Sequence, residues 1–143
     1  MKKARIKREV TMNTKERGKF TIFAYQYKQP NYYIGVCLEF DLITEGKTLI
    51  EAKKNIFHAS VGYLLTIIKN NLSDKLLNFT PDPIYLREYI KLLKRRTKTI
   101  ERIRKEKKQK SENLIPWDKY FSQQDIPYSK DLIKEFEKEE ACV

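Results

Sequence analysis

The 143-residue sequence has few of the residues from which catalytic and metal sites are usually built. It contains one histidine, two cysteines and four glycines, and the glycines form no phosphate-binding loop. Cys37 lies in an apolar run and Cys142 is the penultimate residue, so neither a disulfide framework nor a zinc site is indicated. We therefore expect no cofactor, and this use of cysteine suits a reducing compartment.

Long apolar runs are also missing. None approaches the roughly 20 residues that cross a bilayer, and the basic start of the chain lacks the apolar segment of a signal peptide. The sequence thus predicts a soluble, cytoplasmic protein without a membrane partner. The one histidine, His58, has no Asp, Cys or second His at ligand spacing, so we interpret it as a structural residue.

Positive charge is what the sequence has in excess. The formal net charge is +11 and the pI is near 9.6, which attracts polyanions such as nucleic acid. Residues 81–111 hold 12 Lys and Arg against four Asp and Glu, whereas residues 112–143 hold four against eight. We divide the chain into an α+β domain over residues 1–80, a basic helical extension over 81–111, and an aromatic, then acidic, C-terminal tail over 112–143.

The first part of the chain predicts a small antiparallel sheet. Runs rich in aromatic and β-branched residues indicate strands over residues 20–27 and 32–40, separated by a turn. A short third strand is expected over residues 41–44, and a looser alternation indicates an edge strand over residues 4–12. The fold class is therefore α+β, with three or four strands before the first helix.

Helices follow the sheet. Thr48 and Glu51 have the spacing of a capping box, and the apolar stripe behind them predicts a helix over residues 49–69 that packs on the sheet. A second, long helix is expected over residues 84–110, packed only in its first half, and a short one over 129–140. The apolar positions of the long helix follow a heptad of Leu86, Tyr89, Leu93, Ile100 and Ile103.

Residues 33–52, YIGVCLEFDLITEGKTLIEA, resemble the HicB antitoxin family. The likeness consists of an apolar strand, a Cys-Leu-Glu-x-Asp step, Gly-x-Thr and a Glu-Ala that opens a helix, and it covers about residues 19–70. The resemblance implies a truncated RNase H-like sheet with one helix packed across it, in a non-catalytic protein that neutralises a small RNA-cleaving toxin. The matching positions are Cys37, Glu39, Asp41, Gly46, Thr48, Glu51 and Ala52.

Acidic residues near the motif suggest a further reading, a two-metal nuclease that uses converging carboxylates. We favour structural roles for these carboxylates, because Glu51 is occupied by its capping role and Glu39 and Asp41 share one side of a strand end. No catalytic residue is therefore assigned, and we expect the protein not to be an enzyme. The acids concerned are Glu39, Asp41, Glu45 and Glu51.

The basic helix is a candidate nucleic-acid site, because clustered Lys and Arg neutralise backbone phosphates. The equal alternative is a solvated helix neutralised by the acidic tail, whose residues include Asp131, Glu135 and Glu140. The candidate phosphate-binding residues are Lys91, Lys94, Arg95, Arg96, Lys98, Arg102, Arg104 and Lys105.

Aromatic residues add a second candidate for nucleic-acid contact. Four tyrosines of the predicted strands, Tyr25, Tyr27, Tyr32 and Tyr33, are of the kind that stacks on bases, although such residues more often form cross-strand packing pairs.

Two functional hypotheses remain open from the sequence. The first is a HicB-like antitoxin or adaptor that binds a small toxin protein, and the second is a stand-alone nucleic-acid-binding protein that uses residues 91–110. A toxin, DNA or RNA, and a second copy of the chain are thus the partners to consider.

Overall fold

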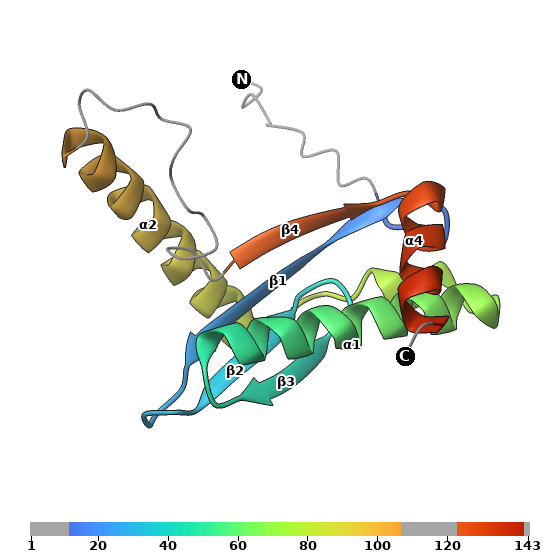
Figure 1. The fold of residues 1–143 in the computed structure, drawn as a ribbon, viewed down its shortest axis with the longest axis horizontal. Coiled ribbons are helices and arrows are strands. Elements are labelled where there is room, and N and C mark those ends of the chain that lie inside the picture. Colours follow the sequence, from blue (N-terminus) through green and yellow to red (C-terminus); the bar gives the residue numbers. More distant parts are fainter. Residues whose placement is uncertain (1–11, 107–122, 142–143) are drawn as a thin grey trace, which may run out of the picture.

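The computed structural model describes residues 12–106 and 123–141, which form a four-stranded antiparallel sheet with helices on both faces (Figure 1). The strands β1 (Gly18–Gln26), β2 (Tyr33–Cys37) and β3 (Leu42–Gly46) form a meander, and β4 (Gln123–Tyr128) joins from far along the chain. The strand order is β3-β2-β1-β4, so β1 is a central strand. The expected α+β fold is confirmed.

The helices begin close to the predicted positions. Helix α1 (Leu49–Lys69) follows Thr48, whose hydroxyl accepts a hydrogen bond of 3.0 Å from the backbone N–H of Glu51. A 3-10 helix, η1 (Asp74–Leu77), comes next, and α2 (Pro83–Glu106) starts where Asp82 accepts a bond from the N–H of Ile84. The last helix is α4 (Lys130–Ala141).

One face of the sheet is covered by α1 and α4. Phe20, Ile22 and Cys37 point to this face and are almost fully buried, as is Ile56 of α1. Helix α4 adds Ile133 and Phe136 to the same cluster, and the Phe136 ring meets the edge of Phe57 on α1. The main core of the protein lies here.

The other face is covered by the first turns of α2. Alternate residues of β1 and β2 point to it, including Phe23 and Val36, and Tyr85, Tyr89 and Leu92 of α2 pack on them. The expectation that the first half of this helix is packed is confirmed. The heptad is wrong at Leu86, which is 39% exposed, and at Leu93, because Tyr85 and Leu92 take their places against the sheet. The side chains of Ile100 and Ile103 are not among those described.

The strand beside β1 is β4, for which the sequence analysis made no prediction. Gly18 pairs with Tyr128 and Phe23 with Gln123, and the Tyr128 hydroxyl donates to the carbonyl oxygen of Thr14 at 2.8 Å. Of the edge strand expected over residues 4–12, residues 4–11 lie outside the described part of the chain, and Met12 is not in a strand. Within residues 12–106 and 123–141, no helix has the length and apolar character needed to cross a membrane.

Candidate nucleic-acid interface

Helix α2 has three faces with different chemistry. At about 100° per residue, Tyr85, Tyr89 and Leu92 share the face on the sheet. Leu86 and Ile90 lie on a second, exposed apolar face. The third face is basic, and each of its six side chains is exposed. These six residues are Arg87, Lys91, Lys94, Arg95, Lys98 and Arg102, and we call them the basic face of α2.

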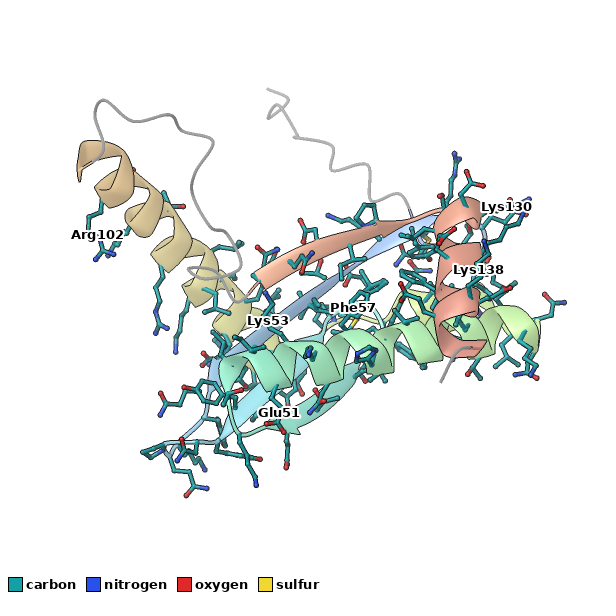
Figure 2. The ribbon with its side chains drawn as sticks, in the orientation of Figure 1. Glu51, Lys53, Phe57, Arg102, Lys130 and Lys138 are labelled. Atoms are coloured by element: carbon teal, nitrogen blue, oxygen red, sulfur yellow. The ribbon has the colours of Figure 1, made fainter. Side chains whose placement is uncertain are left out.

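The basic face lies on the part of α2 that leaves the sheet. Figure 1 shows the later turns of the helix pointing away from the strands, and Figure 2 shows Arg102 near the free end of the described helix. A helix rises 1.5 Å per residue, so the face from Arg87 to Arg102 is about 22 Å long. A row of exposed cations of this length can contact several successive phosphates of one nucleic-acid strand.

The structure brings five of the eight predicted phosphate-binding residues to this one face. The side chains of the other three, Arg96, Arg104 and Lys105, are not among those described. Arg87 was not predicted, because it lies before the dense run of Lys and Arg that begins at Lys91. The signal for Arg87 was present, since it stands four residues before Lys91 and therefore on the same side of the helix.

The described acidic side chains of the tail do not lie beside the basic face. Asp131, Glu135, Glu137 and Glu139 belong to α4, which packs on α1 at the opposite end of the sheet from α2 (Figure 1). Among the described ion pairs, the one that involves the basic face joins Lys91 to Glu88 at 3.3 Å. These four acidic residues therefore do not neutralise the basic face of α2.

A group of tyrosines adjoins the start of α2. Tyr25 is buried, and its ring centroid lies 6.4 Å from that of Tyr27, which in turn lies 6.1 Å from that of Tyr32. Tyr85 packs against this group from α2. Burial and then the carboxylate of Glu88 raise the pKa of Tyr25 to about 12, so its phenol stays protonated at neutral pH.

Residues of the motif over residues 33–52 hold α1 on the sheet. Gly46 ends β3 against the start of α1, where an added Cβ would lie 2.5 Å from the backbone nitrogen of Ala52. Gly35 on β2 meets the same turn, since its Cβ would lie 2.6 Å from the Ala52 carbonyl oxygen. Together with the Thr48 cap, these two glycines let the sheet and the first turns of α1 pack closely. Their role is structural.

Cys37, Glu39 and Asp41 of the motif also have structural roles. Burial raises the pKa of the Cys37 thiol to about 12, so Cys37 is a protonated core residue and not a nucleophile. The Glu39 carboxylate accepts bonds from the Thr21 backbone N–H at 2.7 Å and from the Thr21 hydroxyl at 3.0 Å. Burial raises the pKa of Glu39. Asp41 is exposed in the turn before β3, with a φ of 55°.

The other two carboxylates of this region are those of Glu45 and Glu51. Glu45 accepts a bond of 2.9 Å from the Tyr32 hydroxyl, which raises the pKa of Tyr32, and Glu51 lies in the first turn of α1. Among the described residues no group of three or more His, Cys, Asp or Glu is arranged to hold a metal ion. His58 is exposed on α1, with its ring against the edge of Phe57.

Comparisons of the chain with protein-family models, with characterised proteins and with solved structures give no match.

Proposed function

We propose that this protein is a non-catalytic nucleic-acid-binding protein that contacts the phosphate backbone through the basic face of α2. The observation that carries this proposal is that six exposed Lys and Arg side chains share one side of a helix that projects from the sheet. Clustered cations of this kind release condensed counterions when they meet phosphates, and this release supplies most of a sequence-independent affinity. In this proposal the α+β unit is the scaffold that holds α2.

The test is a titration of a labelled oligonucleotide with the wild type and a variant in which Lys91, Arg95, Lys98 and Arg102 are changed to Gln. Each lost phosphate contact reduces the slope of log K against log salt by about 0.7 to 0.9. We therefore expect the slope to decrease by about three units in the variant. Fluorescence anisotropy at several salt concentrations measures it.

A matched control removes the same charge elsewhere. Lys47, Lys54, Lys75 and Lys134 are exposed and lie outside α2, so changing these four to Gln lowers the net charge equally. The control is expected to keep most of the affinity and the salt slope. Equal losses in the two variants would mean that only net charge matters, and absence of wild-type binding at low salt would refute the proposal.

A second candidate function, the HicB-like antitoxin, is favoured by the exposed apolar face of α2. Leu86 and Ile90 are 39% and 43% exposed at a spacing of four residues, and an apolar helix stripe of this kind suits the groove of a partner protein. The partner would be a small RNA-cleaving toxin. The motif over residues 33–52 and the helix packed across the sheet agree with this candidate.

Inhibition of such a toxin tests the second candidate. If a small RNA-cleaving protein is encoded beside this chain, the purified chain at equal concentration is expected to stop its RNA cleavage. Changing Leu86 and Ile90 to Ser should abolish the inhibition, whereas the four-residue Gln variant of the basic face should retain it. Undiminished RNA cleavage in the presence of the wild-type chain would reject the antitoxin role.

A further inference from the structure

We propose that the nucleic acid is single-stranded, with its backbone along the basic face of α2 and an unpaired base stacked on Tyr27 at the tip of the β1–β2 hairpin. This inference rests on the proposed nucleic-acid binding and adds the class of nucleic acid. It depends on three observations: the exposure of Tyr27, the position of Lys28 beside it, and the continuity of the tyrosine group with the basic face.

Tyr27 differs from the tyrosines around it. Tyr25 is 8% exposed and belongs to the core beneath α2, whereas Tyr27 is 36% exposed. Tyr27 meets Tyr25 and Tyr32 edge to face, at interplanar angles of 81° and 63°. These edge contacts hold the ring upright in the hairpin. An aromatic ring held in this way on a strand end is the platform on which single-strand binders stack a base.

Lys28 supplies a charge at the same place. Its Nζ lies 5.0 Å from the centroid of the Tyr27 ring, and its backbone has a φ of 61° in the turn between the strands. At an exposed site a cation–π contact is weaker than the stacking of a base on an aromatic ring. A base can therefore replace Lys28 over the ring, and the released ammonium group is then available to a phosphate of the same strand.

The tyrosine group is continuous with the basic face through Glu88. The charge of the Glu88 carboxylate helps to raise the pKa of the Tyr25 phenol, and the same carboxylate pairs with Lys91 at 3.3 Å. Helical spacing puts Glu88 between Tyr85, which packs on the tyrosines, and Lys91, the second residue of the basic face. One strand of nucleic acid can thus pass from the hairpin tip to Arg102 without crossing the exposed apolar face of α2.

The need to stack a base on the Tyr27 ring favours a single-stranded nucleic acid. In a duplex the faces of the bases are stacked on one another, so a protein ring reaches them only after costly unstacking. An exposed tyrosine ring at the end of a hairpin, beside a lysine, needs a base that is already free. Because every base has a stackable face, we expect little dependence on sequence.

The experiment compares three labelled or competing probes: a single-stranded oligonucleotide of about 12 nucleotides, the same sequence as a duplex, and inorganic polyphosphate, which has charge but no bases. Tyr27→Ala is expected to weaken single-strand binding about tenfold. It should leave duplex and polyphosphate binding unchanged. Tyr27→Phe keeps the ring and should bind the single strand like the wild type.

Phe79 provides a matched control, because it is 39% exposed and lies outside the tyrosine group. Phe79→Ala is expected to leave all three affinities unchanged. The single-strand proposal is overturned if Tyr27→Ala has no effect, or if it weakens binding of all three probes alike. Such a result leaves the basic-face proposal standing, provided that the Gln variant of α2 still loses its salt dependence. Circular dichroism of each variant confirms that it is folded.

Discussion

The face of the sheet beneath α1 and α4 is closed, whereas the face beneath α2 is covered only in part. On the first face, Phe20 and Ile22 are at most 1% exposed. On the second, the cover by α2 leaves Tyr27 partly exposed, as well as Ile43, which pairs with Val36 and shares its face. The first face therefore holds most of the stabilising core, and the second presents the surface to which we assign binding.

This comparison predicts a large loss of stability from truncation on the closed face. Ile56 is fully buried, so Ile56→Ala leaves a cavity and is expected to reduce the free energy of unfolding by about 2–5 kcal/mol. Ile50 belongs to the same helix but is 69% exposed. Ile50→Ala should change stability by less than about 0.5 kcal/mol. Urea denaturation of both variants measures the difference, and equal effects would show that α1 is misplaced.

On the partly covered face, the corresponding change should cost less. Tyr89 packs on Phe23 with a centroid separation of 5.6 Å but keeps some exposure, so we expect Tyr89→Ala to cost about 1–3 kcal/mol. Ile90→Ala, the next residue on the exposed apolar face, is the control and should be nearly neutral. A cost for Tyr89→Ala as large as that of Ile56→Ala would mean that the two faces contribute equally to the fold.

The smallest predicted effect is a dependence of stability on pH that comes from Glu39. Because burial raises the pKa of Glu39 in the folded protein, the folded state holds this proton more tightly than the unfolded state. The contribution of Glu39 to stability is therefore greatest below its unfolded pKa and is lost as the pH rises through its folded pKa.

The Glu39→Gln variant tests this effect. The amide does not titrate, so the variant is expected to lack this part of the decline in stability, which is at most about 1.4 kcal/mol per pH unit. Urea melts of the wild type and the variant between mildly acidic and neutral pH measure the two slopes. Identical slopes would contradict a raised pKa for Glu39.

Much of the fold was predictable because its signals are local. The Thr48 cap and the stripe of α1 lie within one segment, and the first three strands form hairpins between neighbours. Strand β4 was missed because an edge strand faces solvent along one side, so its sequence contains Gln124, Asp125 and Pro127 among few apolar residues. Its pairing with β1 is a contact between distant parts of the chain.

The candidate site was predictable in its charge but not in its arrangement. The density of Lys and Arg in α2 is visible in the sequence, whereas the choice of Tyr85 over Leu86 to face the sheet depends on the shape of the surface beneath. That choice turns the basic residues outward and sets Glu88 toward the tyrosines. The position of the acidic α4 at the far end of the sheet likewise depends on tertiary packing alone.

The pairing of β4 with β1 also sets an order of events in synthesis. Strand β1 ends at Gln26 and β4 begins at Gln123, so almost 100 residues must be made between them. At about 5–20 residues per second, roughly 5–20 s pass between the synthesis of β1 and that of β4. During that interval one edge of β1 has no strand beside it, while the meander and α1, which need only local contacts, can already form. Strand β4 thus completes the sheet last, and until it does the free edge of β1 can pair with another chain.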